Sequence, residues 1–305
     1  MEVLNTLNRF REFIMFKYNS ANTADAYCSA VGVFLNHFKE RAEPKDINAD
    51  EIIAYLMTIH NLHTRRNAHS AVKLFYKHKS KNGFSNKFRY IPYPEKPHTL
   101  PNPISKEEFI LIINACDNIK HKCIMMLPFD SGLRVSEVIN LKLEHIDTFK
   151  MQIHVKGAKG RKDRIVKLSQ ILFNYLCEYV EKYTPIDYLF NGQFPAKELR
   201  YSVRSCQEVL KIYAKKAGIR RNIKFHEARH GFAVSLLDND TPLDTIRERL
   251  GHASIETTRI YAPLSNREIQ RTESPMEQII RTDETALINT KLFKNNSSIN
   301  FHILK

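Results

Sequence analysis

The stretch PYPEKPHTLPNP, residues 92–103, divides the chain into two parts with different sequence patterns. It holds five of the twelve prolines of this 305-residue protein. Because proline fixes φ and has no N–H to donate, the stretch predicts an extended, semi-rigid segment. Domains usually span about 100–200 residues. The sequence therefore predicts a first domain at 1–90, a linker at 91–103, a second domain at 104–265 and a tail at 266–305.

Residues 1–90 show apolar side chains at helical spacing in four successive segments, without strand-like alternation. The segments are marked by these pairs of apolar positions: Leu7 and Phe10, Val31 and Phe34, Ile52 and Leu56, and Val72 and Phe75. One apolar face per helix is what a small bundle buries. The first domain is therefore predicted to be a four-helix unit.

Residues 104–265 combine helical patterns with one short pair of strands. Ser105 and Glu108 form a capping box, which predicts a helix start. Apolar residues alternate on both sides of residues 157–160, which predicts a β-hairpin turning there. The chain is thus predicted to be mainly α, with a four-helix domain followed by an α-rich domain that holds a small antiparallel β-sheet. A capping pattern at 274–277 predicts a short helix in the tail.

The charge of the chain indicates a polyanionic partner. Lys and Arg number 47 against 33 Asp and Glu, a net charge of +14. Phosphates of nucleic acid bind such a surface through counterion release, and the alternative is merely a well-solvated basic surface. The segment 62–96 has nine basic residues and one acid, and aromatic residues interleave them. Six of the nine are candidate DNA contacts: Arg65, Arg66, Lys73, Lys77, Lys79 and Lys81.

Other compartments and partners are disfavoured by composition. No apolar run approaches the roughly 18 residues that span a bilayer, and residues 1–19 mix charged with apolar side chains, unlike a secretory signal. The five cysteines are scattered and never in a C-x-x-C spacing. We therefore expect a reduced, cytoplasmic protein without a membrane partner, a disulfide framework or a cysteine-based metal site.

Four short segments carry chemically suggestive side chains. They are Arg134 and Glu137 after a glycine break, Lys159 in the predicted hairpin turn, His226 and Arg229 in HEARH, and His252 with Tyr261 nine residues later. Singly, each has an ordinary explanation, such as a surface ion pair or a half-buried tyrosine. Together they supply the residue types that metal-free phosphodiester cleavage requires.

The chemistry explains why these types belong together. A tyrosine that attacks phosphorus must lose a proton near pH 7 although its free pKa is about 10, and cations and a histidine base favour that loss. The transition state gathers negative charge on the non-bridging oxygens, which suits two guanidiniums. The leaving 5′-oxygen needs a proton, which a lysine on a hairpin supplies.

Two other interpretations compete for the same residues. HEARH at 226–230 also matches the H-E-x-x-H signature of zinc hydrolases. Leu236, however, stands where the extended signature places its third histidine. Alternatively, residues 241–261 form a helix-turn-helix and the protein is a non-catalytic DNA-binding regulator. The zinc hydrolase predicts loss of activity with a chelator, and the regulator predicts DNA binding without cleavage.

The order and spacing of these segments resemble the tyrosine recombinases of the phage-integrase type, close in size and layout to Xer-type recombinases and short bacterial integrases. The resemblance covers about residues 1–265 and rests on SGLRVSEV at 131–138, KGRKDRIV at 159–166, HEARH at 226–230 and LGH at 250–252 followed by Tyr261. The first domain is similar to the family's SAM-like core-binding domain. One departure from the family pattern is Gly231, directly after HEARH, at a position where the family usually has a residue with a hydroxyl group or a small side chain. Type IB topoisomerases share the chemistry but add a larger clamp.

The resemblance implies a role for each site residue. It implies that Tyr261 is the nucleophile that forms a 3′-phosphotyrosyl link and that Arg134 and Arg229 bind the scissile phosphate. It implies that Lys159 is the general acid and that His226 accepts the proton of Tyr261. His252 would donate to a phosphate oxygen, and Glu137 would support the site. The phosphotyrosyl link conserves bond energy, so no metal, ATP or other cofactor is expected.

The resemblance also implies partners. The substrate would be double-stranded DNA, and four protomers would exchange strands through a Holliday junction. The basic segment 62–96 would line one side of a clamp around the duplex. The tail helix would dock on a neighbouring protomer, or else pack on its own domain.

Overall fold

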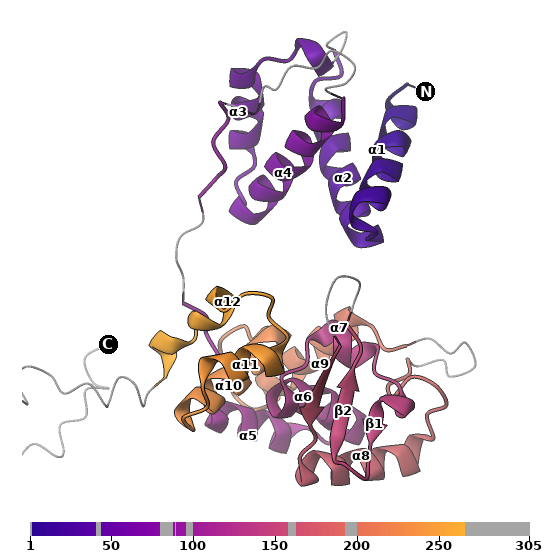
Figure 1. The fold of residues 1–305 in the computed structure, drawn as a ribbon, viewed down its shortest axis with the longest axis vertical. Helices are drawn as coiled ribbons and strands as arrows, with labels where there is room; N and C mark the ends of the chain where they lie inside the picture. The colour runs from indigo at the N-terminus through magenta and orange to yellow at the C-terminus, as the bar shows by residue number, and fades with distance from the viewer. Residues whose placement is uncertain are drawn as a thin grey trace, which may run out of the picture. The chain divides into compact units, whose positions relative to one another are not determined.

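The computed structural model describes residues 2–40, 44–79, 88, 90–95, 100–157, 163–192 and 200–265. The chain forms two compact units, Met1–Thr99 and Leu100–Lys305, so the division falls inside the proline-rich stretch. Figure 1 shows the elements of each unit. The tail at 266–305, with the helix predicted at 274–277, lies outside the described residues, as do Lys81 and Lys159.

The first unit is the predicted four-helix domain. Its helices are α1 (Glu2–Tyr18), α2 (Ala21–His37), α3 (Ala49–Thr58) and α4 (Leu62–Lys79), with a 3₁₀ turn η1 (Pro44–Asp46) before α3. The core is built from the predicted apolar faces, and Phe10, Phe34 and Phe75 have no exposed surface. Burying a side chain of that size contributes about 1.5–3 kcal/mol. Association of these faces, rather than helix propensity, holds the short helices together.

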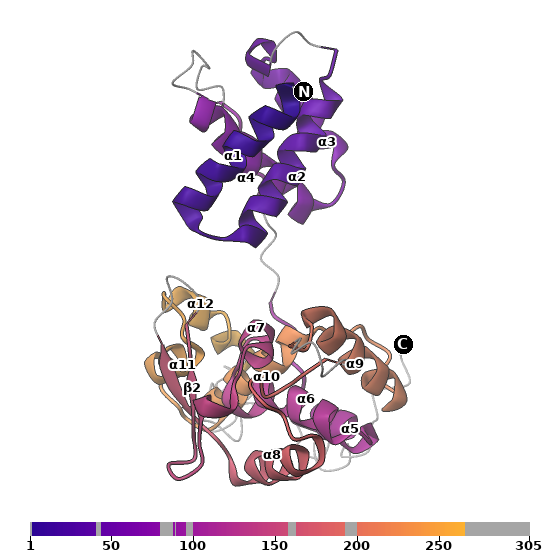
Figure 2. The ribbon, with the colours of Figure 1, turned by 90° about the vertical axis from the view of Figure 1, so that its right-hand side faces the viewer.

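The second unit is the predicted α-rich domain. It contains α5 (Lys106–Ala115), α6 (Ile119–Ser131), α7 (Val135–Ile139), α8 (Gln170–Tyr183), α9 (Val203–Lys216), α10 (Phe225–Asp238), α11 (Leu243–Leu250) and α12 (Glu256–Arg259), with 3₁₀ turns η4 (Leu143–His145) and η6 (Ala262–Leu264). The capping box of Ser105 and Glu108 is present at the start of α5. In Figures 1 and 2, α11 and α12 lie side by side.

A three-stranded antiparallel sheet lies beside these helices, in the order β1 (Ile146–Asp147), β2 (Gln152–Val155) and β3 (Arg164–Lys167). Ile153 pairs with Val166, and both side chains are buried. The predicted strand pair is thus confirmed as β2 and β3, while the turn residues 158–162 lie outside the described ranges. Strand β1 was not predicted, because two residues are too short to show alternation.

Two glycines allow the close packing that assembles the site. Gly132 ends α6 with φ +67°, and a Cβ there would lie 2.6 Å from the ring of Phe232. Gly231 lies inside α10, where a Cβ would lie 2.5 Å from the carbonyl oxygen of Ile104. Because neither glycine has a side chain, α10 approaches both α6 and the segment that precedes α5. This approach places Arg229 of α10 beside the loop that carries Arg134.

Candidate active site

Arg229 is the centre of the site and is fully buried. Its Nη1 donates to the carbonyl of Gly132 at 2.6 Å, and its Nη2 donates to the carbonyl of Leu250 at 2.5 Å. These carbonyls belong to the C-terminal ends of α6 and α11. Helix ends leave such carbonyls without intrahelical partners and carry partial negative charge, so a cation satisfies both requirements. Arg229 therefore ties α6, α10 and α11 together at one point.

Glu137 gathers three guanidiniums around one carboxylate. Arg134 donates to Oε1 from Nη1 at 2.9 Å and to Oε2 from its backbone N–H at 2.8 Å. Arg164 donates to both oxygens, and Nη1 of Arg229 lies 3.7 Å from Oε2. Burial alone would raise the pKa of Glu137, but the hydrogen bonds and charges of Arg164 and Arg134 outweigh it and lower the pKa to about 2. The carboxylate is therefore ionised and holds the arginines in place.

The two phosphate-binding candidates thus lie side by side. Arg134 is the residue before α7 and also donates to the carbonyl of Gly251 at 3.3 Å. Its side chain is 18% exposed, so part of it still faces solvent. Burial first, and then the positive charge of Arg134, lower the pKa of Arg229. A guanidinium starts from a pKa so high that it stays charged at neutral pH. Two adjacent, oriented cations form an anion site.

Tyr261 is buried, and its hydroxyl is hydrogen-bonded to a histidine. Tyr261 is 1% exposed and packs with Phe232, Ile246 and Leu250 in a small apolar cluster. Its Oη lies 2.9 Å from Nδ1 of His230. Burial raises the pKa of Tyr261, and the charges of Arg229 and Arg134 oppose that increase. The predicted nucleophile therefore lies within the field of both predicted phosphate ligands.

His226 and His252 occupy two other sides of the site. His226 lies one helical turn before His230 on α10, is exposed, and its ring centroid is 4.4 Å from that of His230. His252 follows α11, and its Nδ1 shares a 2.9 Å hydrogen bond with the hydroxyl of Thr258. Burial first, and then nearby positive charges, lower the pKa of His252 to about 3. His252 is therefore neutral at pH 7.

The structure brings together five of the six predicted catalytic residues, and the sixth, Lys159, lies outside the described ranges. Two further residues of this network, His230 and Arg164, were not assigned a role from sequence. His230 was visible only as the second histidine of HEARH, four residues after His226 and hence on the same helical face. Arg164 stood inside the quoted hairpin segment, but nothing local links it to Glu137, 27 residues earlier.

The residues of the zinc signature are engaged elsewhere. Glu227 accepts a hydrogen bond from Arg221 at 2.5 Å, and Arg221 also donates to both oxygens of Glu108. His230 is bonded to Tyr261. Within the described residues, no group of three or more His, Cys, Asp or Glu side chains is arranged to hold a metal ion. Glu227 instead fastens the start of α10 to the start of α5.

Five of the six candidate DNA contacts lie on α4 and have different neighbours, while Lys81 lies outside the described residues. Arg65 donates from Nε to the carbonyl of Ile59 at 2.9 Å. The guanidinium of Arg66 lies 4.3 Å from the ring centre of Tyr93. The side chains of Lys73 and Lys77 are exposed, whereas that of Lys79 is partly buried. Lys73 and Lys77 line a hollow of about 290 Å³ together with three tyrosines. Lys73 and Lys77, four residues apart on α4, therefore form a basic face beside aromatic rings.

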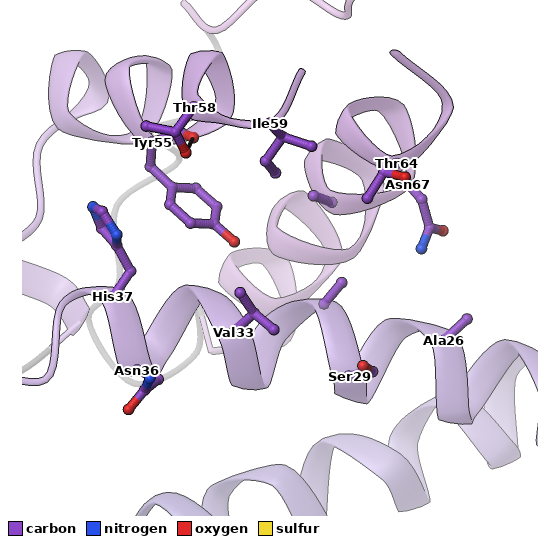
Figure 3. Close-up of a pocket in the computed structure, with 12 residues that line it drawn as sticks. Ala26, Ser29, Val33, Asn36, His37, Tyr55, Thr58, Ile59, Thr64 and Asn67 are labelled. Carbon is purple, nitrogen blue, oxygen red and sulfur yellow. Dashed lines mark hydrogen bonds between the residues drawn. The ribbon is translucent and has the colours of Figure 1, made fainter. Parts of the chain in front are cut away.

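A second hollow of the first unit contains none of the candidate residues. It has a volume of about 450 Å³ and lies between α2, the end of α3 and the start of α4 (Figure 3). Small and polar side chains line it together with Val33 and Ile59, and His37 and Tyr55 are its titratable groups. Among the described residues, the catalytic candidates all lie in the second unit, and this hollow adds none to them.

Comparison with known proteins agrees with this geometry. A family model described as "Phage integrase family" matches residues 103–268, and one described as "Phage integrase, N-terminal SAM-like domain" matches residues 6–83. The chain belongs to the phage integrase family. Its relatives include the protein named tyrosine recombinase XerA of Pyrococcus horikoshii, 28% identical over 273 residues, which cover 88% of this chain and 93% of that protein. The XerA protein of Pyrococcus furiosus is 30% identical, covering 87% and 91%.

Solved structures give the same result for the fold. A crystal structure of XerA recombinase has a TM-score of 0.52 and 29% identity, covering 88% of this chain and 96% of that one. XerH bound to its difH substrate in a post-cleavage complex has a TM-score of 0.71 at 21% identity, covering 85% and 80%, and supports the fold alone. The prediction of a Xer-like tyrosine recombinase, an enzyme that cleaves and rejoins DNA site-specifically, is confirmed, and the regulator and zinc-hydrolase alternatives are not favoured.

Among the helices that the structure describes, none is both long and apolar enough to cross a membrane.

Proposed function

We propose that this phage integrase family member cleaves double-stranded DNA through Tyr261. The phenol oxygen attacks the scissile phosphorus, a 3′-phosphotyrosyl link forms and a 5′-hydroxyl leaves. Arg134 and Arg229 bind the non-bridging oxygens, and their position beside Tyr261 is the observation that carries the proposal. Since the arginines are held by Glu137 and by helix-end carbonyls, they are oriented before the charge develops, which lowers the reorganisation cost.

The remaining roles follow the chemistry of each side chain. Lys159 donates a proton to the leaving 5′-oxygen. His252, neutral at pH 7, donates an N–H to a phosphate oxygen. His226 is exposed beside Arg229, where an imidazole is accessible to a bound phosphate. The phosphotyrosyl link stores the energy of the broken bond, so rejoining needs no ATP and no metal.

Assembly on DNA completes the proposed reaction. The exposed Lys73 and Lys77 of α4 contact phosphates on one side of the duplex, while Arg66 supports that face from its stack on Tyr93. Four protomers bind two sites and exchange strands through a Holliday junction. The solved relatives include a lambda integrase tetramer bound to a Holliday junction. We place the reaction in the cytoplasm, where the substrate DNA of such an enzyme lies.

A covalent-trapping experiment tests the proposal. Duplexes with a randomised core are selected for binding, and the selected sequences are rebuilt as suicide substrates with single nicks at successive positions. The protein is then incubated with each duplex in EDTA, and denaturing gels are scored for a protein–DNA adduct. We expect an adduct that resists the chelator and disappears in Tyr261→Phe. An adduct that persists in Tyr261→Phe, or no adduct on any selected duplex, contradicts the proposal.

A further inference from the structure

Three successive carbonyls at the end of α11 each accept a hydrogen bond from a different arginine. The pairs, carbonyl first, are Arg249 with Arg164 at 2.8 Å, Leu250 with Arg229 at 2.5 Å and Gly251 with Arg134 at 3.3 Å. Carbonyls at a helix end lack intrahelical partners and carry partial negative charge, so guanidiniums suit them. His252 is the next residue along the chain. The arginines therefore fix the turn that presents His252.

All three guanidinium nitrogens of Arg164 are bonded to the protein. Nη1 and Nη2 donate to the two oxygens of Glu137 at 2.9 and 2.8 Å, while Nε donates to the carbonyl of Arg249. The side chain of Arg164 is 9% exposed, against 18% for that of Arg134. Two parallel hydrogen bonds hold a carboxylate in one orientation, which an ammonium group cannot do. Arg164 is therefore placed to hold protein groups rather than a substrate.

The surroundings of Arg164 are built for this contact. A Cβ at Gly251, where φ is +61°, would lie 3.0 Å from Cδ of Arg164, so glycine leaves room for the side chain. Burial would raise the pKa of Glu137, and the hydrogen bond and charge of Arg164 are the largest effects that oppose it. The carboxylate that orients Arg134 is thus kept ionised chiefly by Arg164.

We propose that Arg164 is a positioning residue for DNA cleavage, which fixes Glu137 and the end of α11 relative to each other. Arg134 is held by Glu137, and His252 follows the end of α11. One side chain therefore determines where both donors meet the non-bridging oxygens of the scissile phosphate. This inference rests on the proposed function and adds a residue to it. Loss of Arg164 should displace these donors without removing them, and a misplacement of about 1 Å costs about 10²-fold in rate.

Arg164→Lys tests the geometry separately from the charge. Lysine remains positive but cannot bond both oxygens of Glu137 and the carbonyl of Arg249 at once. Arg249→Lys is the matched control, because the side chain of Arg249 is exposed and its carbonyl is unchanged by the substitution. Adduct formation is measured in a single turnover at saturating suicide duplex. We expect Arg164→Lys to be slower by about 10²-fold, and Arg249→Lys to match wild type.

Sulfur-substituted duplexes identify the step that Arg164 supports. Sulfur in place of a non-bridging oxygen accepts hydrogen bonds weakly, so wild type should react more slowly on at least one of the two diastereomers. In Arg164→Lys the displaced donors should discriminate less, and the ratio of the oxygen rate to the sulfur rate should fall towards one. A variant that is merely less stable keeps the wild-type ratio, and that result overturns the inference.

A second duplex carries sulfur at the bridging 5′ position, where the leaving group needs no proton. The defect of Arg164→Lys should persist on this duplex, since the inferred role concerns the non-bridging oxygens. Recovery to the wild-type rate would assign Arg164 to protonation of the leaving group instead and overturn the inference. Arg164→Lys at the wild-type rate on the ordinary duplex overturns the inference alone, whereas wild type without any adduct overturns the proposed function as well.

A measurement on wild type guards against a variant that does not fold. In ¹⁵N-arginine-labelled protein, with resonances assigned through the backbone, Nη1 and Nη2 of Arg164 should give separate signals because both are held by Glu137. A freely rotating guanidinium at Arg164 contradicts the inference whatever the variants show.

Discussion

Arg164 clamps Glu137 with two parallel hydrogen bonds, from Nη1 to Oε1 at 2.9 Å and from Nη2 to Oε2 at 2.8 Å. Both side chains are 9% exposed. The Nε of Arg164 also donates to the carbonyl of Arg249 at 2.8 Å. One side chain at the start of β3 therefore joins this strand to α7, through the carboxylate that holds Arg134, and to the end of α11, through the carbonyl of Arg249.

Glu137→Gln tests the importance of that carboxylate. The change keeps the shape of the side chain but removes the counter-ion of three guanidiniums, of which that of Arg229 is fully buried. Breaking a buried pair by removing one partner costs about 3–5 kcal/mol. We expect the free energy of unfolding of the second unit, measured with urea, to fall by roughly 3 kcal/mol. Glu178→Gln on α8 provides a matched control, and an equal loss in both variants contradicts the prediction.

Acid should weaken the second unit in two stages. The pKa values of His230 and His252 are lowered to about 4 and about 3. Below about pH 6.5 these histidines therefore bind protons in the unfolded chain but not in the folded chain. The free energy of unfolding then falls by about 1.4 kcal/mol per pH unit for each histidine.

Glu137 extends the loss to lower pH. Its pKa is about 2 in the folded chain and about 4.3 when unfolded. The stabilisation it provides is complete above the unfolded value and disappears as pH falls towards 2, a total of about 3 kcal/mol. Urea titrations at successive pH values measure both stages. His252→Asn should flatten the first stage, and an unchanged slope would count against the assignment.

Thr258→Val should impair cleavage without unfolding the protein. The hydroxyl of Thr258 is buried beside Nδ1 of His252. In the tautomer that carries the ring proton on Nε2, this hydroxyl donates to Nδ1 and leaves the Nε2–H for a phosphate oxygen. Valine has nearly the same shape but no hydroxyl, so the two neutral tautomers compete. We expect single-turnover adduct formation to slow by about tenfold. The exposed neighbour Thr257→Val is the matched control, and equal rates for the two variants refute the tautomer role.

Gly231→Ala should destabilise the second unit, although alanine favours helices. The new Cβ would lie 2.5 Å from the backbone oxygen of Ile104 and 2.8 Å from the ring of Phe129. Overpacking of this kind costs about 1–3 kcal/mol. In Gly32→Ala on α2 the nearest atom is 3.6 Å away, so the helix should gain about 0.5–1 kcal/mol. Thermal unfolding should therefore shift in opposite directions, and a shift of the same sign contradicts the packing argument.

Much of the fold follows from local patterns. The four helices of the first unit, the capping box at Ser105 and the β2–β3 pair depend on residues close together in sequence, and periodicity predicts them. The two-residue strand β1 and the four-residue helix α12 were not predicted, because elements that short are too short to show a hydrophobic periodicity. The spacing of the motifs around Arg134, Arg229 and Tyr261 was sufficient to indicate a tyrosine recombinase.

The sequence by itself determined which chemistry this protein carries, since the residue types and their order specify a tyrosine nucleophile, cations for a phosphate and histidines for proton transfer. Only the tertiary structure decided which side chains meet. His226 and His230 share one helical face, and which of them contacts Tyr261 depends on where the segment of Tyr261 packs against α10. Arg164 reaches Glu137 because β3 passes beside the end of α11. Such contacts depend on the packing of distant segments, and no local period records them.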